Sequence, residues 1–213
     1  MKILVVGAHP DDEILGVGGT ICRHIVNGDQ VSVCIVTKAI EPRWSKQYME
    51  QKRIEQQAVD RLLGVSMRYH LDFPTTQLNT ISQGELNDAV NQTVDVIRPD
   101  IVYTHFGDDL NADHGLVSRA CLVATRPPKR IKLLCFETLS ETEWGTTAFK
   151  PNMWINIGEY IEKKIQAFNI YVSEVQKYPH PRSADGIKSL ARNRGTEACL
   201  EYAEGFVLIR EIQ

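Results

Sequence analysis

The sequence predicts an α/β fold in which helices cover both faces of a mostly parallel sheet. Short and continuously apolar runs, such as residues 3–6, are typical of strands that are buried on both sides. Between them lie longer stretches in which apolar residues recur with the 3.6-residue period of a helix. Such alternation favours a parallel sheet, because a chain needs a crossover, usually a helix, between neighbouring parallel strands.

The first two-thirds of the chain carry this alternation most clearly. Residues 2–7 and 31–37 are apolar enough for buried strands, and each is followed by a stretch of helical period. Gly28 and Gly64 end the first two helices in the manner of a C-terminal glycine, and Pro99 follows the third helix. We therefore predict strands at 2–7, 31–37, 66–70, 100–105 and 132–137, helices at 13–27, 46–63, 83–97 and 114–124, and a turn-rich segment at 73–75.

The last third is less regular. We predict a strand at 153–157, helices at 158–175 and 185–202, and an edge strand at 206–209, with an irregular loop at 178–185. A length of 213 residues suits one domain. We expect a single domain over 1–213, with a regular core at about 1–137 and an irregular α+β part at about 138–213.

Composition excludes several classes of protein. Lys and Arg total 24 and Asp and Glu total 27, so the formal charge of −3 gives no electrostatic case for nucleic acid or an acidic membrane. No apolar run is long enough to span a bilayer, and the N-terminal run is too short for a signal peptide. The five cysteines form no C-x-x-C pair, which favours reduced thiols. We expect a cytoplasmic protein.

Two loops concentrate the residues that could carry chemistry. Residues 8–13 (Ala-His-Pro-Asp-Asp-Glu) follow the first strand, and residues 105–114, which end in Asp113 and His114, follow the fourth. Ligands of open α/β sheets bind beyond the carboxyl ends of the strands. If the first and fourth strands are neighbours, the two loops converge.

The chemistry of the two loops is that of a divalent-metal site. A catalytic zinc takes three protein ligands from imidazole and carboxylate groups, plus a water whose pKa falls from about 15.7 to about 7. A further carboxylate nearby can take a proton from that water. Asp12 or Asp113 alone would be read as a helix cap, and His9 alone as a hydrogen-bonded histidine. The pair of loops together favours the metal site, although iron, cobalt or manganese would also suit it.

These residues resemble the PIG-L/LmbE family of zinc-dependent N-acetylglucosaminyl deacetylases. The resemblance is carried by the 8–13 motif, by the distal Asp113-His114, and by the segments at 62–64, 98–104 and 202–206. It implies a Rossmann-like three-layer sandwich and removal of the N-acetyl group from an N-acetylglucosamine-type sugar or sugar conjugate. Carried over by position, His9, Asp12 and His114 would bind Zn²⁺, Asp11 would be the general base, and Asp113 would support the site.

The sequence departs from the family at one position. Many members have a histidine three residues before the distal ligand, and here that position is Asn111. An amide can donate a hydrogen bond to substrate but cannot deliver a proton. Protonation of the departing amine would then fall to Asp11, after it has accepted a proton, or to His105, and the sequence does not choose between them.

Further substrate-binding residues are predicted from weaker signals. Arg53 lies where family arginines contact substrate, and His180 and Arg182 form a loop that, with arginines 192 and 194, could bind a phosphate. Trp144 could stack on a sugar ring. The glycines at 16, 18 and 19 come too late after the first strand for a dinucleotide fingerprint.

Two alternative functions stay open at this point. One is a metal-dependent amidohydrolase that acts on another small N-acyl compound, and the other is a family member that binds metal or sugar without turnover. The predicted partner is a small-molecule amino sugar or sugar conjugate, with no nucleic acid and no membrane span, and the sequence leaves open whether a second copy of the chain binds.

Overall fold

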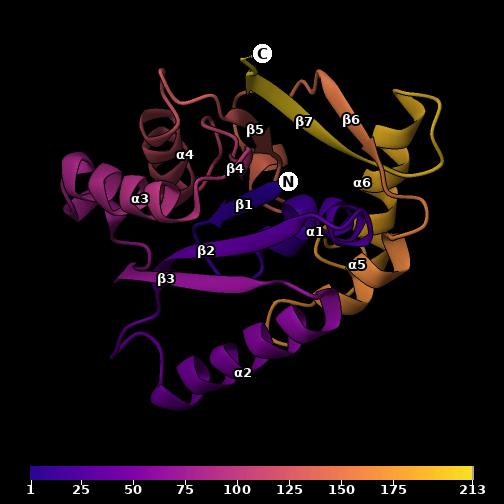
Figure 1. The fold of residues 1–213 in the computed structure, drawn as a ribbon. Coiled ribbons are helices and arrows are strands. Elements are labelled where there is room, and N and C mark those ends of the chain that lie inside the picture. Colours follow the sequence, from indigo (N-terminus) through magenta and orange to yellow (C-terminus); the bar gives the residue numbers. More distant parts are fainter. Residues whose placement is uncertain (213) are drawn as a thin grey trace.

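The computed structural model describes residues 1–212 and contains one seven-stranded sheet with the strand order β3-β2-β1-β4-β5-β7-β6. The strands β1 to β5 are parallel, whereas β7 runs antiparallel to both β5 and β6 (Figure 1). The predicted α/β three-layer sandwich is confirmed. The strands are β1 (Lys2–Gly7), β2 (Gln30–Lys38), β3 (Met67–Pro74), β4 (Ile101–His105), β5 (Lys132–Phe136), β6 (Met153–Asn156) and β7 (Ala203–Arg210). The helices are α1 (Asp12–Val26), α2 (Lys46–Leu63), α3 (Gln83–Ile97), α4 (Ala112–Ala124), α5 (Ile161–Phe168) and α6 (Ala184–Thr196).

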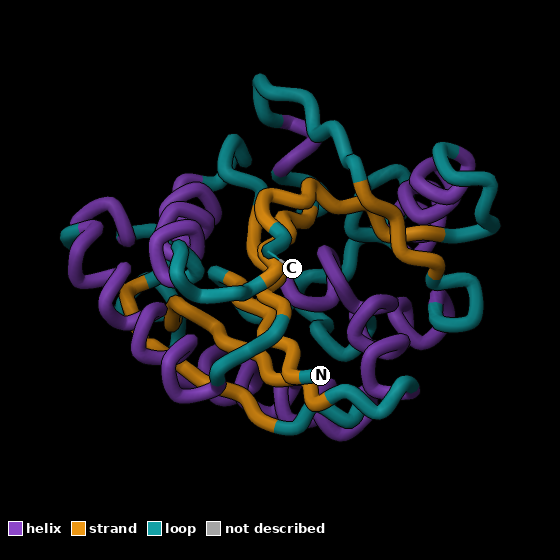
Figure 2. The backbone as a smooth tube through the Cα atoms, turned by 45° about the horizontal axis from the view of Figure 1, so that its top comes forward, coloured by secondary structure: helices purple, strands orange, loops and turns teal. Residues whose placement is uncertain are grey.

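The sheet is buried by two separate hydrophobic cores. On β1, Ile3 and Val5 point into one core, and Leu4 and Val6 point into the other, because successive side chains of a strand alternate. Helices α1, α2, α5 and α6 supply the first core, and α3 and α4 supply the second. Figure 2 shows the strands running between these two groups of helices. This double coverage explains why the central strands read as continuous apolar runs.

The pairing of β1 with β4 decides where the site lies. Ile3 pairs with Ile101 and Val5 with Tyr103 in parallel register. The loop that follows β1 and the loop that follows β4 therefore leave the sheet side by side at its carboxyl edge. This is the arrangement that the predicted convergence of the two loops requires.

Helix α1 approaches the sheet very closely, and its glycines make that possible. A Cβ atom on Gly16 would collide with the ring of Phe136, and one on Gly19 would lie 2.7 Å from Ile157 Cγ2. Between them the helix is interrupted, because Val17 has non-helical dihedral angles of φ −136° and ψ 18°. The glycine-rich stretch thus serves helix packing.

The predicted ends of several elements were wrong. Strand β3 continues into the predicted turn as far as Pro74, and its register with β2 shifts between His70 and Phe73. Helix α5 covers only Ile161–Phe168. The residues after it turn toward α1 and α2, because the Tyr171 hydroxyl donates to Glu13 and the Val172 amide donates to Glu55. Helix α6 stops at Thr196, and the chain turns back through Cys199, which has a positive φ of 54°.

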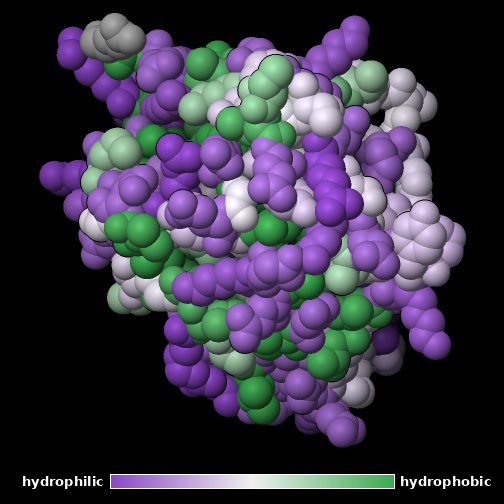
Figure 3. Space-filling model, turned by 90° about the vertical axis from the view of Figure 1, so that its right-hand side faces the viewer, coloured by the Kyte–Doolittle hydropathy of each residue, from purple (hydrophilic) through white to green (hydrophobic). Residues whose placement is uncertain are grey.

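Within residues 1–212, no helix is both long and apolar enough to cross a bilayer. Figure 3 shows the side of the molecule that carries α5, α6 and β6, where hydrophilic residues are interspersed with smaller apolar areas.

Candidate active site

Three predicted ligands meet at the carboxyl edge of the sheet. Each of His9, Asp12 and His114 offers a ligand atom, and these atoms lie within 4.8 Å of one another. His9 Nδ1 is 3.2 Å from His114 Nε2, and each of these two nitrogens lies 3.5 Å from an oxygen of the Asp12 carboxylate. Asp12 and His114 are almost fully buried, whereas the His9 side chain is 21% exposed. The cluster is therefore reached from solvent on the side of His9.

A carboxylate lies near the outer ring nitrogen of both His9 and His114. Asp113 Oδ2 lies 3.1 Å from His9 Nε2, and Asp109 Oδ1 lies 3.3 Å from His114 Nδ1. Such carboxylate–histidine pairs fix the ring orientation and leave the opposite nitrogen free for a metal. The prediction that Asp113 supports the site agrees with this contact, but Asp109 was missed. The signal for Asp109 was present in the acidic loop before α4.

The buried groups of the cluster shift one another's pKa values. Burial alone would lower the pKa of His9, but hydrogen bonds to Asp113 and Asp12 outweigh it and raise this pKa to about 10. Burial and the neighbouring His105 lower the pKa of His114 to about 4. Burial opposes ionisation of Asp12, yet the nearby His114 and His105 hold its pKa well below the ordinary value.

A buried oxygen of Asp12 that lacks a hydrogen-bond partner in the described part of the chain indicates that the cluster fits a cation. Asp12 Oδ1 is buried and has no hydrogen-bond partner among residues 1–212. A buried carboxylate oxygen without a partner is costly unless a cation or a donor binds it. His9, Asp12 and His114 together thus have the donor set of a His₂Asp metal site.

Asp11 lies beside the cluster but faces another way. Its backbone is left-handed, with φ 115° and ψ −26°, and its Oδ2 accepts a hydrogen bond from Arg182 Nη1 at 3.0 Å. Burial raises the pKa of the Asp11 carboxyl well above its ordinary value, although the Arg182 guanidinium counteracts this effect. An aspartate carboxylate next in the chain to a candidate metal ligand is a candidate general base.

Arg182 is surrounded by carboxylates. Besides Asp11, its guanidinium meets Glu174 at 3.4 Å and Glu141 at 3.5 Å, and its Nε donates to Ser140 Oγ at 2.7 Å. A guanidinium held by three carboxylates is not available for a phosphate. The structure therefore brings Arg182 to the site but not in the substrate-binding arrangement that the sequence suggested.

Arg53 does not reach the site. Its side chain is 57% exposed on α2 and pairs with Glu50, one turn away on the same helix. The preceding residue, Lys52, points inward instead, and its Nζ lies 2.8 Å from Glu174 Oε1. A helix turns by about 100° per residue, so Lys52 and Arg53 lie on different faces of α2.

The other predicted residues occupy the margin of the site. Asn111 caps α4, and its side-chain oxygen accepts the amide of Asp113 at 3.1 Å. His180 Nδ1 accepts the amide of Arg182, and its ring meets the edge of Trp144, which is 54% exposed. Arginines 192 and 194 lie away from the cluster, because the first covers the Tyr202 ring and the second pairs with Glu137.

His105 is held inside the protein. It is fully buried and stacks on His114 with a ring-centroid distance of 3.8 Å. Its Nε2 accepts the amide N–H of Ala8 at 2.9 Å, and its Nδ1 lies 3.2 Å from Thr138 Oγ1. Both ring nitrogens are thus engaged, which argues against His105 as the acid that protonates a departing amine.

Comparisons with known proteins agree with this geometry. The sequence model of the PIG-L family, described as GlcNAc-PI de-N-acetylase, matches residues 4–125. The uncharacterized deacetylase YaiS of Escherichia coli strain K12 is 28% identical over 180 residues, which are 80% of this chain and 90% of that protein. The conserved protein TT1542 of Thermus thermophilus has a similar structure, with a TM-score of 0.81, 25% identity, and coverage of 99% of this chain and 96% of that one.

A further solved structure shares the fold. The N,N'-diacetylchitobiose deacetylase of Pyrococcus horikoshii superimposes with a TM-score of 0.79 at 20% identity, over 98% of this chain and 83% of that one. The family match spans more than half of the sequence and includes His9, Asp12 and His114. The chain belongs to the PIG-L family of deacetylases.

Proposed function

We propose that the protein is a metal-dependent hydrolase that removes the N-acetyl group from an N-acetylglucosamine-type sugar or sugar conjugate. The observation that carries the proposal is the convergence of His9, Asp12 and His114, with Asp11 next to Asp12 in the chain. The names of the similar proteins support the reaction, since they include deacetylases and, for the structure from Pyrococcus, a deacetylase of an N-acetylated disaccharide.

His9, Asp12 and His114 would hold the metal, with zinc as the ion that the donor set fits best. When bound, such an ion supplies a water that is acidic near neutral pH and a Lewis acid for the amide carbonyl. The 21% exposure of the His9 side chain leaves an approach for a substrate from that side. Asp113 and Asp109 keep the two imidazoles oriented.

Asp11 would act as general base. Arg182 occupies its Oδ2, whereas Oδ1 makes no hydrogen bond within residues 1–212 and is the oxygen that would accept a proton from the attacking water. We assign Arg182 to holding this carboxylate rather than to binding substrate. With both nitrogens of His105 engaged, we also assign the return of the proton to the departing amine to Asp11.

The experiment combines metal analysis with acetate release. The purified protein is expected to bind about one zinc and to release acetate from at least one compound in a panel of N-acetylglucosaminyl conjugates. Asp11→Asn is expected to retain the metal while kcat falls by roughly 10²–10⁴-fold, the usual contribution of a general base. The matched control is Asp88→Asn, since Asp88 is exposed on α3.

Three outcomes separate the alternatives. Unchanged turnover in Asp11→Asn would remove Asp11 from the mechanism. Turnover only of N-acyl compounds without a sugar would favour the other amidohydrolase. Stoichiometric zinc without acetate release from any compound would favour a protein that binds without catalysis.

A further inference from the structure

Glu13 is a buried carboxylate in the motif that has no part in the mechanism above. It is 0% exposed, and none of its hydrogen bonds goes to His9, Asp12 or His114. Its Oε1 accepts from Arg68 Nη2 at 3.0 Å and from the Tyr171 hydroxyl at 2.7 Å. Its Oε2 accepts the backbone N–H of Asp11 at 3.0 Å.

The residue that Glu13 holds has an unusual backbone. A non-glycine residue at φ 115° costs on the order of 1–3 kcal/mol, and such residues persist only where their surroundings determine them. Asp11 is also the N-cap of α1, and its carbonyl accepts the amides of Ile14 and Leu15 at 2.9 Å each. The peptide on the other side of Asp11 is fixed by Glu13.

This conformation frees the Asp11 side chain. The carboxylate of an aspartate at the N-cap ordinarily accepts a hydrogen bond from an amide of the first helical turn. Here the cap makes no side-chain hydrogen bond, because the left-handed backbone directs the carboxylate to Arg182. The neighbouring Asp12 faces the histidines instead. The carboxylates of Asp11 and Asp12 thus have different partners, Arg182 for the first and the histidines for the second.

We propose that Glu13 is a positioning residue for the reaction, whose carboxylate fixes the backbone of Asp11 so that the Asp11 side chain is available as general base. This inference rests on the proposed function of Asp11. The carboxylate is well suited to the task, because Arg68 comes from β3 and Tyr171 follows α5, and Arg68 is itself held by Asp60 of α2. Three elements therefore set its position.

The test is a double-mutant cycle between Glu13→Gln and Asp11→Asn. Arg68 and Tyr171 donate to one oxygen of Glu13 and the Asp11 N–H to the other, so in glutamine the oxygen is expected to face the charged guanidinium and the hydroxyl, and the NH₂ group to face the Asp11 N–H. Glu13→Gln is expected to lower kcat by about tenfold or more, as small displacements of a catalytic group do, with the metal content and KM nearly unchanged. In the Asp11→Asn background the same change is expected to cost less than about twofold, since the group that it positions is gone.

A second readout does not depend on turnover. The Asp11 amide is expected to exchange its hydrogen at least about tenfold faster in Glu13→Gln than in the parent protein, because a bonded and buried amide loses its acceptor. Assigned NMR spectra of the two proteins under identical conditions measure this ratio. Exchange at an unchanged rate would overturn the proposal.

The matched control is Glu204→Gln. Glu204 is likewise a buried glutamate that accepts two amides of α1, from Gly19 and Thr20, but these lie away from Asp11. Any loss of kcat in this variant is expected to be the same factor in both backgrounds. If Glu13→Gln also lowers kcat by the same factor in both backgrounds, Glu13 has only a structural role. The inference about Glu13 then fails, while the assignment of Asp11 as general base is unaffected. If Asp11→Asn keeps full activity, the proposed base and its positioning residue fail together.

Discussion

At the scale of single residues, Arg182 contacts carboxylates of the protein where the sequence predicted contact with substrate. Its guanidinium lies 3.0 Å from Asp11 and is shared with Glu174 and Glu141. We expect Arg182→Met to lower kcat by roughly 10–100-fold, because the Asp11 carboxylate loses the group that orients it. Steady-state kinetics on the zinc-loaded protein measure the effect, with kcat and KM reported separately.

Arg53→Met is the control for that variant. Arg53 was predicted to bind substrate, but it is exposed and paired with Glu50. Its replacement is expected to leave both kcat and KM within about twofold, since exposed pairs contribute little. A rise in KM with unchanged kcat in Arg182→Met would instead return Arg182 to substrate binding.

The residue scale also separates what the sequence could predict from what it could not. His9, Asp12 and His114 could be identified because they lie in, or directly after, the loops that follow two recognisable strands, and the pairing of these strands brings the loops together. The partners of Asp11 could not be identified, because Arg182 is 171 positions away and no local pattern links them. Glu13 was visible in the motif, but its partners on β3 and after α5 were not.

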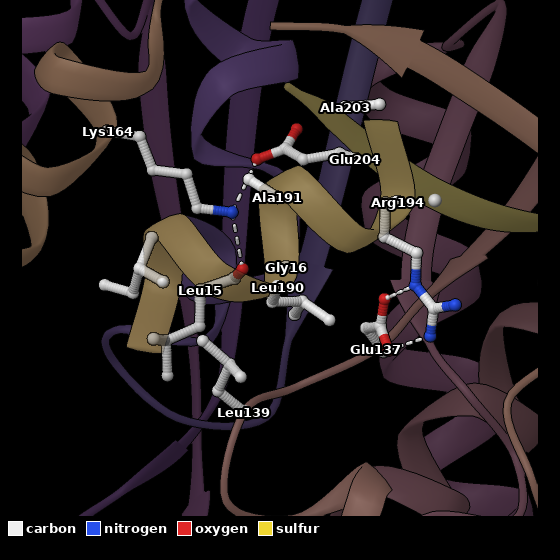
Figure 4. A pocket seen from close by; sticks show the side chains of 12 residues that line it. Leu15, Gly16, Glu137, Leu139, Lys164, Leu190, Ala191, Arg194, Ala203 and Glu204 are labelled. Carbon is white, nitrogen blue, oxygen red and sulfur yellow. Dashed lines mark hydrogen bonds and ion pairs between the residues drawn. The ribbon is translucent and has the colours of Figure 1, made fainter. Parts of the chain in front are cut away.

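At the scale of elements, a buried ion pair binds backbone groups of α1 around its interruption at Val17. Glu204 of β7 accepts the amides of Gly19 and Thr20, and Lys164 of α5 donates to the carbonyl of Leu15 and to Glu204. Figure 4 shows the two side chains meeting beside Leu15. Both are almost fully buried, at 4% and 5% exposure. The buried pair thus satisfies backbone groups on both sides of the interruption.

We expect Lys164→Met to lower the free energy of unfolding by about 3–5 kcal/mol, because it leaves the Glu204 charge buried without a cation. Urea unfolding at neutral pH measures this loss. The matched control is Lys188→Met. Lys188 pairs with Glu162 and its side chain is 31% exposed, so its loss is expected to cost about 0–1 kcal/mol. Equal losses in the two variants would contradict this account of the interruption.

Another prediction concerns the link between β1 and the end of α1. Asp29 contacts the N-terminal amino group and His24 Nδ1, both at 2.7 Å. Burial opposes its ionisation, but these two contacts outweigh burial and lower the pKa of Asp29 below 3.8. A carboxylate with a lowered folded-state pKa stabilises the fold above its unfolded pKa, and this stabilisation is lost as the pH falls through the folded value.

Asp29→Asn is therefore expected to cost about 1 kcal/mol at pH 7, and the difference from the parent protein is expected to shrink below about pH 3.8. Denaturant titrations across this range measure both proteins. A difference that stays constant between pH 7 and about pH 2 would show that the charge of Asp29 does not contribute.

The elements illustrate a general limit of sequence interpretation. Their cores could be predicted, because hydrophobic period reflects burial against the sheet. Their ends could not, since tertiary contacts decide them. Helix α5 ends at Phe168, short of the predicted end at 175, because Tyr171 turns to Glu13 and the Val172 amide turns to Glu55.

At the scale of the whole molecule, the sheet joins the two parts of the chain. Strand β5, from the regular part, pairs with β7, from the irregular part, and α5 and α6 pack into the same core as α1 and α2. No separate core belongs to the segment at 138–212 within the described residues. We therefore expect one cooperative unfolding transition, with coincident curves for fluorescence and circular dichroism. Two separated transitions would contradict a single domain over 1–213.

We expect metal binding to stabilise the fold against that single transition. His9 and Asp12 come from the loop and helix after β1, and His114 comes from α4 after β4, so an ion would connect the two halves of the sheet at its carboxyl edge. At a free zinc concentration about 100 times Kd, binding is expected to add roughly 2.7 kcal/mol and to raise Tm by about 5–10 °C over the chelator-treated protein. Calorimetry with and without zinc measures the shift. His114→Asn is expected to abolish it and Asp88→Asn to preserve it, because only the first removes a ligand; a shift of equal size in both variants would place the stabilising metal at another site.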